Sequence, residues 1–490
     1  MLSKVFPDGQ TIKFRIAGVG LIFLAYAPGV FKESFWSDDY GALMDTSSFV
    51  AHVLKDARPV AAGIFSMSFS LLDSPANAWM MRSLALLALI LIFLIISNRI
   101  RNSSHENIGI FSIAVAFCLP SFQMFIHWSL TWFFLWAALA GLYAFHFWSS
   151  KLKTRKIFAV FLLVFALTIY PPTAIFYFSA ITLVNVLNYS KLPEFFSDIV
   201  RGLSLLVIAG ITSTFVVFVT MNFVGVSANA RVSIVTLSEI PEKFIWLISR
   251  PLVVGMRPFM IDSPSPKIAF ITSIPIILIL FFGIRRQSID LSESIFRRAI
   301  CVILPLIFTL IPIIITSDNQ IEFRLLPGYC GGILALASFY LLAMIQNWLR
   351  PLNVSQLFKT SIMSAVPMVL VLVSVTSVNS HYSDLFENPY KKKTAFLNAK
   401  ISSCLKGGLL KDVLILPPRI PFPSLPRLGV FSTSTDLASS WVPKPNVELL
   451  LKLRDIKASV TYLENRPLDW ETLATSCVID LEDFRKLLVE

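Results

Sequence analysis

Charge is scarce in this sequence. Only 15% of the 490 residues are Asp, Glu, Lys or Arg, whereas 55% are hydrophobic. A soluble domain carries about 25% charged residues, so a chain this poor in charge needs another solvent for its surface. The apolar residues form continuous runs, several of about 18 residues or more, and such runs cross a bilayer as helices rather than as the alternating strands of a barrel. The sequence therefore predicts an all-α polytopic membrane protein.

Histidine and cysteine are also rare, with five of each, and a zinc or iron site is therefore not expected. The sequence has no Gly-rich phosphate loop, HExxH motif, CxxC pair or nucleophile elbow. Without an ATP-binding domain, any reaction must use a substrate that is already activated. The net charge of +12 does not indicate nucleic-acid binding, because many of the Lys and Arg residues lie in short loops between apolar runs, where they orient the chain in the membrane.

About eleven apolar segments are candidates for membrane spans. If the N-terminus is cytoplasmic, the inner segments hold 17 Lys and Arg residues and the outer loops hold 9, as the positive-inside rule requires. An odd number of spans then places the C-terminus outside. Pro120, Pro171 and Pro172 interrupt the stretch 108–189, so span boundaries are least defined there. The expected spans are 12–31, 78–97, 108–122, 126–148, 157–170, 172–189, 203–224, 268–284, 299–316, 327–346 and 360–378.

Three outer segments are long or polar. They are the first outer loop, 32–77, a second large outer loop, 225–267, and the C-terminal region, 380–490. The first contains an amphipathic piece at 60–73 that is too short to span and is expected at the membrane interface. We therefore predict a transmembrane domain over 1–379 and a separate outer domain over 380–490.

The C-terminal region differs in composition from the rest of the chain, with more Lys and Pro and no further span. Short β-like runs and amphipathic helix-like runs predict a small α/β or α+β domain. Cys404 and Cys477 are its two cysteines. In an oxidising compartment they form either a disulfide or two free thiols, since sequence gives no geometry. The expected strands and helices are 413–416, 458–462, 396–405 and 480–489.

A pair of adjacent carboxylates, Asp38 and Asp39, follows the first span by a few residues. Two carboxylates beside an apolar surface repel each other and lose hydration, so the pKa of at least one is expected to be raised. A carboxylate with a raised pKa suits a general base that takes a proton from a hydroxyl. Asp is also common in turns and at helix N-caps, and the pair alone is more typical of an interfacial turn.

Basic residues in the outer loops suggest an anionic ligand. Arg58 can bind a phosphate bidentately, or pair with Asp56 or a lipid headgroup. Arg324 lies at a membrane boundary, where an ionisable residue is either functional or a snorkelling anchor. Arg257 belongs to the loop 225–267, which is more basic than an outer loop should be and fits an anionic ligand or anionic lipid.

His127 lies near the outer end of a short span. It either faces a cavity or is a hydrogen-bonded histidine at a helix end, and the second arrangement is the more common.

Taken together, these features resemble the GT-C class of integral-membrane glycosyltransferases. More narrowly, the chain is similar to the serotype-converting O-antigen glucosyltransferases of the glucosyltransferase II (Gtr) type. The resemblance covers the whole length: a short inner N-terminus, a first helix, an acidic pair in the first outer loop, about ten further spans and an outer C-terminal domain. The motifs that carry it are Ser37-Asp38-Asp39-Tyr40, Arg58-Pro59 and Glu322-Phe323-Arg324.

The resemblance implies an inverting transfer of a sugar, with glucose as the expected one, from undecaprenyl phosphate to a hydroxyl of lipopolysaccharide O-antigen. The reaction would occur at the periplasmic face of the bacterial inner membrane, after a donor synthase and a flippase have supplied the lipid-linked sugar. Asp38 would deprotonate the acceptor and Asp39 would orient the acceptor or the base. Arg58, Arg324 and Arg257 would hold the leaving phosphate. The residues expected to contact substrate are Tyr40, Glu322 and His127.

No cofactor is required in this scheme, because a lipid phosphate is already a good leaving group. A divalent cation held by Asp38 and Asp39 stays an open alternative.

Three other functions are open at this point. A flippase for lipid-linked sugars is expected to have repeated halves and charges inside its spans, and neither is evident. An O-antigen polymerase or ligase would place its main Arg-rich outer loop late in the chain. The loop 225–267 fits that class, whereas the early acidic pair and the C-terminal domain do not. A membrane acyltransferase usually needs a catalytic histidine in a polar motif, and His127 has apolar neighbours.

Overall fold

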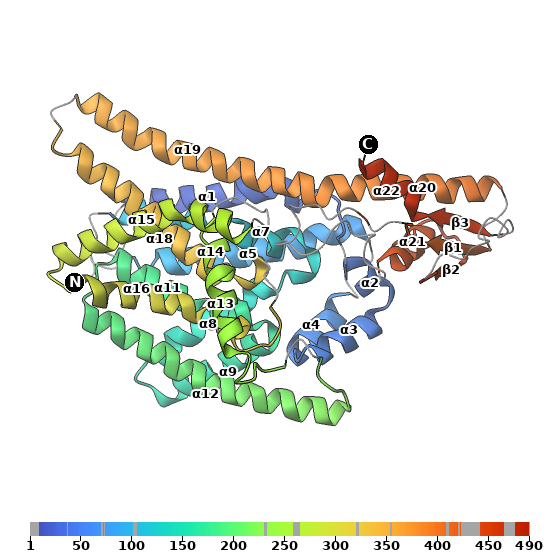
Figure 1. The fold of residues 1–490 in the computed structure, drawn as a ribbon, viewed down its shortest axis with the longest axis horizontal. Coiled ribbons are helices and arrows are strands. Elements are labelled where there is room, and N and C mark those ends of the chain that lie inside the picture. Colours follow the sequence, from blue (N-terminus) through green and yellow to red (C-terminus); the bar gives the residue numbers. More distant parts are fainter. Residues whose placement is uncertain are drawn as a thin grey trace.

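The chain folds as an all-α polytopic membrane protein with a small α/β unit at its C-terminal end (Figure 1). The computed structural model describes residues 9–36, 38–69, 72, 74–100, 105–229, 233–257, 265–319, 323–352, 355–407, 411–419, 422, 442–464 and 476–489. Within these residues, seven helices are long and apolar enough to cross a membrane. They are α1 (Gly9–Val30), α5 (Ala78–Ser97), α8 (Phe134–Trp148), α12 (Leu192–Val224), α15 (Pro266–Asp290), α18 (Pro327–Leu349) and α19 (Gln356–Tyr382).

A further apolar helix pair is bent, and it adds an eighth candidate crossing if the pair is one span. The expected span 108–122 is replaced by α6 (Glu106–Ala116) and α7 (Pro120–His127), which are bent by 56°. Proline lacks the N–H that a helix interior uses but fits its first turn, and Pro120 stands at the start of α7. Other short helices follow, and proline stands in the first turn of two of them, α10 and α17. These helices are α9 (Lys153–Ile169), α10 (Pro171–Ala174), α11 (Tyr177–Leu187), α16 (Ile295–Phe308) and α17 (Ile311–Ile314).

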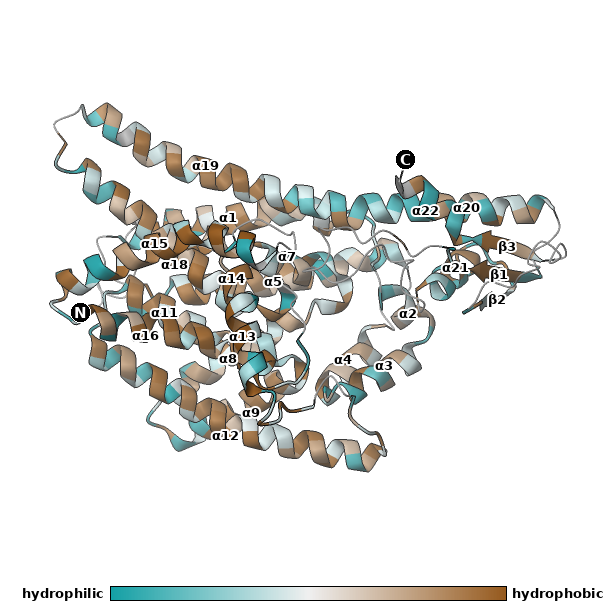
Figure 2. Ribbon diagram, viewed as in Figure 1, coloured by the Kyte–Doolittle hydropathy of each residue, from teal (hydrophilic) through white to brown (hydrophobic). Residues whose placement is uncertain are grey.

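Burial differs sharply between the long helices. The most apolar window of α18 is 78% buried inside the protein, whereas those of α12 and α19 are 17% and 11% buried. Figure 2 shows that α12 and the first part of α19 are predominantly hydrophobic. Soluble proteins rarely expose apolar surfaces of this extent, so lipid is the solvent that these two helices require.

Two groups of polar contacts join the segments between the helices. Between segments expected to form outer loops, Asn229 donates to the carboxylate of Asp56 at 2.7 Å, and the ammonium of Lys243 donates to the backbone carbonyl of Asp318 at 2.7 Å. The second group joins segments that are expected at the inner ends of the membrane spans. Its contacts are Arg15 with Glu106 at 3.5 Å, Arg298 with the Ser190 carbonyl at 2.6 Å, and His105 with Gln346 at 2.8 Å.

The first outer loop is helical. Its helices are α2 (Asp38–Met44), α3 (Thr46–Lys55) and α4 (Pro59–Ser68), and α4 corresponds to the amphipathic piece expected at 60–73. The second large outer loop contains α13 (Ile240–Ser249) and α14 (Pro251–Val254). Its residue Ile234 forms an isolated antiparallel bridge with Thr316, which places it beside the late polar loop.

The C-terminal unit is built on a parallel three-stranded sheet in the order β2-β1-β3, with β1 (Asp412–Leu416), β2 (Ser459–Tyr462) and β3 (Cys477–Asp480). Parallel neighbours need crossover connections, which gives the unit its α/β character. The expected strands match β1 and β2 to within one residue, whereas β3 was not predicted. Val413, Ile415, Val460, Ile479 and Phe484 form a hydrophobic core separate from that of the membrane helices. The helices of the unit are α20 (Asn388–Lys406), α21 (Pro443–Lys452) and α22 (Leu481–Val489).

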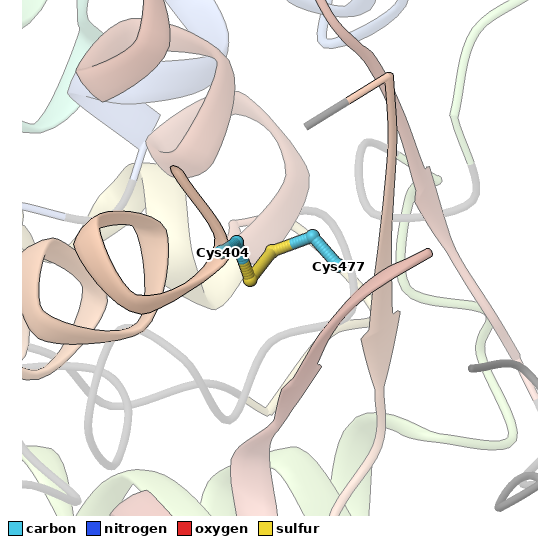
Figure 3. Close-up of a disulfide and its surroundings, with 2 residues drawn as sticks. All are labelled: Cys404 and Cys477. Carbon is cyan, nitrogen blue, oxygen red and sulfur yellow. A yellow bond between two sulfur atoms is a disulfide. The ribbon is translucent and has the colours of Figure 1, made fainter. Parts of the chain in front are cut away.

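One continuous helical path connects the membrane to this unit. Helix α19 passes through a π-helical turn, Ser383–Glu387, directly into α20 (Figure 1). The domain boundary expected at 379–380 therefore falls inside a helix. At the far end of α20, Cys404 is disulfide-bonded to Cys477 of β3, with 5.4 Å between the Cα atoms (Figure 3). Helix α21 packs against α2 of the first outer loop.

Candidate functional site

A cavity of about 280 Å³ lies where the first outer loop, the late polar loop and the prolines of α10 meet. We call it the arginine cavity. It brings together Asp38, Arg58 and Arg324, three of the residues expected from the sequence to act at one site. These three residues lie far apart in the sequence, and the fold brings them to one cavity. Other lining residues are Phe49, His52, Asp56, Trp128, Leu130, Thr131, Tyr170, Pro171, Pro172, Thr316 and Asp318.

The two carboxylates of the acidic pair have different environments. Asp39 is fully buried, and its two oxygens accept hydrogen bonds from the backbone N–H groups of Trp36 at 2.9 Å and Leu130 at 3.2 Å. Burial raises the pKa of Asp39 to about 7, against the opposing effect of these N–H groups. Asp38 is half-buried and lines the cavity. The first turn of α2 is thus anchored by Asp39 and presents Asp38.

Arg82 on α5 holds the link between α1 and α2 in place. It is 1% exposed and donates to the backbone carbonyls of Gly29, Lys32 and Ser34, and to the Ser34 hydroxyl at 2.7 Å. Arg82 also attracts the neighbouring Asp39 electrostatically. The sequence analysis did not select Arg82. An ionisable residue inside a span is a functional candidate by default, and that signal would have found it.

Aromatic rings support the two arginines of the cavity. The Arg58 guanidinium lies 5.1 Å from the ring centroid of Tyr170, and that of Arg324 lies 5.2 Å from the ring centroid of Trp128. Such cation–π contacts orient a guanidinium. Of the two partners considered for Arg58, Asp56 is instead bonded to Asn229.

The late loop that carries Arg324 is held by the second outer loop. Lys243 of α13 donates to the Asp318 carbonyl at 2.7 Å and to the Asn319 side chain at 3.0 Å. Burial lowers the pKa of Lys243, as expected for an ammonium removed from water. The basic loop 225–267 therefore contributes to the site by positioning the late loop.

Tyr40, Arg257 and His127 were expected at the site but do not line the cavity. Tyr40 is buried, contacts Phe35 edge-on, and has the ammonium of Lys393 4.1 Å from its ring centroid. Arg257 is buried beyond α14 and is not part of the cavity lining. Glu322, also expected to contact substrate, lies outside the described residues, as does Ser37 of the first motif.

His127 is the third of these residues. It is buried among aromatic side chains, with ring-centroid distances of 5.6 Å to Tyr26 and 4.8 Å to Tyr382. Neither of its ring nitrogens has a hydrogen-bond partner among the described residues, so it is not the hydrogen-bonded helix-end histidine considered from the sequence. It packs beside the site and is not part of the cavity lining.

The described residues contain no group of three or more His, Cys, Asp or Glu side chains placed to hold a metal ion. The alternative of a divalent cation between Asp38 and Asp39 stays open. Each oxygen of Asp39 accepts one backbone N–H hydrogen bond, so a cation shared with Asp38 would use a remaining lone pair of Asp39.

A second cavity, of about 490 Å³, adjoins the first. We call it the domain groove, because Pro445 of α21 forms part of its wall. Asp38, Phe49 and His52 line both cavities. His52, which lies 3.9 Å from the Asp56 carboxylate, was missed from the sequence because a lone histidine on a short helix carries no motif. The groove is lined by Asp38, Gly41, Asp45, Ser48, Phe49, His52 and Pro445.

No protein-family model, curated protein or solved structure matches this chain.

Proposed function

We propose that the protein is an inverting glycosyltransferase of the GT-C type. It moves a sugar, with glucose as the expected one, from undecaprenyl phosphate to a hydroxyl of lipopolysaccharide O-antigen. The observation that carries the proposal is the position of Asp38, a carboxylate in the lining of both the arginine cavity and the domain groove. A base that serves two substrates has to reach the boundary between their binding sites.

In the proposed reaction, the lipid phosphate of the donor lies in the arginine cavity, beside Arg58 and Arg324. Asp38 takes the proton from the acceptor hydroxyl, and the freed oxygen attacks the anomeric carbon from the side opposite the phosphate. The bond between the anomeric carbon and the phosphate oxygen breaks, and its electron pair leaves with the phosphate. Negative charge that grows on the phosphate in the transition state is stabilised by the two guanidinium groups.

The proposal includes eleven spans, a cytoplasmic N-terminus and a periplasmic C-terminus in a bacterial inner membrane. Eleven spans result if the pairs α6–α7, α10–α11 and α16–α17 each cross once and α9 crosses as well. In support, the polar contacts between loops join segments that this topology places on the same side. Protease added to the periplasm should digest an epitope at the C-terminus, and protection of the epitope would overturn this orientation.

Cells that make both an O-antigen and a polyprenyl-linked sugar provide the test of function. Wild-type protein is expected to add a side-chain sugar to the O-antigen, whereas Asp38→Asn should abolish the addition at equal membrane expression. The control is Asp290→Asn, because Asp290 is a surface carboxylate paired with Arg286. Full modification in Asp38→Asn cells would overturn the assignment of the base.

A further inference from the structure

The two cavities differ in their charged side chains. The arginine cavity contains the guanidinium groups of Arg58 and Arg324 together with the carboxylates of Asp38, Asp56 and Asp318. The domain groove has two carboxylates, Asp38 and Asp45, and no Lys or Arg among its described lining residues. Guanidinium groups that can bind a phosphate therefore lie in the first cavity, whereas the carboxylates of the groove repel one.

Asp45 is fixed in the wall of the groove by its place in the fold. It is the N-cap of α3, where its carboxylate accepts a hydrogen bond from the Ser48 backbone N–H at 3.0 Å and from the Ser47 hydroxyl at 2.9 Å. These hydrogen bonds, and less strongly the nearby charge of Lys444, lower the pKa of Asp45, so it stays ionised at neutral pH. Asp45 therefore contributes a permanent negative charge at one end of the groove.

The remaining lining suits a sugar ring. Phe49 is half-buried, with its ring packed edge-on against Phe65 at 5.1 Å between centroids, and Pro445 supplies a second apolar surface. Ser48 and His52 are exposed polar side chains in the same lining. Apolar surfaces combined with a few hydroxyl, carboxylate and ring N–H groups recognise a saccharide through its C–H face and its hydroxyl groups.

We propose that the domain groove binds an uncharged acceptor saccharide and that Asp45 excludes acidic sugars from it. This inference rests on the proposed function. A carboxylated sugar in the groove would lie between two like charges, whereas the hydroxyl groups of a neutral sugar can donate hydrogen bonds to the same carboxylates. The groove wall formed by α21 makes the C-terminal unit part of the acceptor site.

The kinetic test compares two acceptors with the purified protein and a polyprenyl-phosphate-linked sugar. One acceptor is a neutral oligosaccharide released from the host lipopolysaccharide, and the other is the same oligosaccharide with its C6 hydroxyls oxidised to carboxylates. Wild-type protein is expected to show a KM about 10-fold higher for the acidic acceptor. Asp45→Asn should bring the two KM values together without changing the KM for the donor.

Asparagine caps a helix as well as aspartate does, so Asp45→Asn removes the charge and keeps α3 intact. Asp455→Asn is the matched control, since Asp455 is an exposed carboxylate of the C-terminal unit outside the groove. Equal KM values for the two acceptors in wild type, or an unchanged ratio in Asp45→Asn, would overturn the inference. If Asp38→Asn remains fully active, it is instead the proposed function that fails.

A binding measurement makes the inference independent of turnover. The three free cysteines, Cys118, Cys301 and Cys330, are buried, so Ser48→Cys would introduce an exposed thiol into the groove. The neutral oligosaccharide should slow its reaction with a water-soluble maleimide, and the oxidised one should not. Equal protection by both oligosaccharides, or protection by neither, would contradict the assignment of this groove.

Discussion

Asp39 accepts a hydrogen bond from the backbone N–H of Leu130 at 3.2 Å, across 91 residues of sequence. Its second oxygen accepts from Trp36, so this carboxylate joins the start of α2 to the turn before α8. Asp39→Asn would turn an amide NH₂ group toward one of these N–H donors. We expect a loss of about 1–3 kcal/mol in stability, measured as a lower Tm in detergent, whereas Asp38→Asn should keep the wild-type Tm.

The raised pKa of Asp39 also predicts how stability changes with pH. Its pKa is about 7 in the folded protein and 3.8 in the ordinary case, so between these values the folded state holds a proton that the unfolded state has lost. Its contribution to stability therefore falls as pH rises from about 4 to 7, by up to roughly 4 kcal/mol. Tm measured from pH 5 to pH 8 should fall more in wild type than in Asp39→Asn. Parallel curves would contradict a protonated Asp39.

Stability and sugar transfer should depend on the number of hydrogen-bond donors at position 82. Lysine keeps the charge but cannot reach all the carbonyl groups of Gly29, Lys32 and Ser34, and methionine leaves them unsatisfied in a buried site. Sugar transfer and Tm are expected to decrease in the order wild type, Arg82→Lys, Arg82→Met. The same two substitutions at Arg286, which is exposed and paired with Asp290, should leave both unchanged. An Arg82→Met protein with wild-type Tm would show that the link between α1 and α2 does not need the hydrogen bonds of Arg82.

Arg58 and Arg324 are expected to act mainly on kcat. Lysine at either position keeps a positive charge but loses the planar fork that contacts two phosphate oxygens. Arg58→Lys and Arg324→Lys should each lower kcat on the order of 10²-fold, with little change in the KM for the acceptor. Initial rates with the purified protein would measure this. A change confined to the acceptor KM would contradict the assignment of these residues to the donor phosphate.

The disulfide is expected to stabilise the C-terminal unit. It closes a loop of 73 residues between Cys404 and Cys477, and a cross-link of this kind contributes about 2–4 kcal/mol. A Cys404→Ser, Cys477→Ser double variant should lose the resistance of α20–α22 to limited proteolysis. Adding dithiothreitol to wild type should have the same effect, and equal resistance in all samples would show that the bond is dispensable.

Membrane helices and the main site residues could be predicted because local sequence encodes them. Long apolar runs gave α5, α12 and α18, and the side of the membrane expected for each loop brought Asp38, Arg58 and Arg324 together in one hypothesis. The break at Pro120 was foreseen, but its 56° bend was not, since the angle depends on packing against neighbouring helices.

Residues whose role depends on distant partners could not be predicted in the same way. Arg82 bonds to carbonyl groups about 50 positions upstream. Every residue has a backbone carbonyl, so the sequence does not indicate which ones accept. Asp45 and His52 line the groove only because α21 packs against α2. Tyr40 was expected at the substrate because it adjoins the acidic pair, yet the helix turns it toward Lys393. β3 was missed although β2, which also has four residues, was predicted; the last residue of β3, Asp480, was assigned to the expected helix 480–489.

The central claim is that Asp38 takes the acceptor proton, and the rate of sugar transfer by purified Asp38→Asn protein tests it most directly. At saturating polyprenyl-linked donor and acceptor, we predict a kcat about 10²–10⁴-fold below wild type, with unchanged Tm and donor binding, and a wild-type product of inverted anomeric configuration. A folded Asp38→Asn protein that transfers sugar at the wild-type rate would contradict the account.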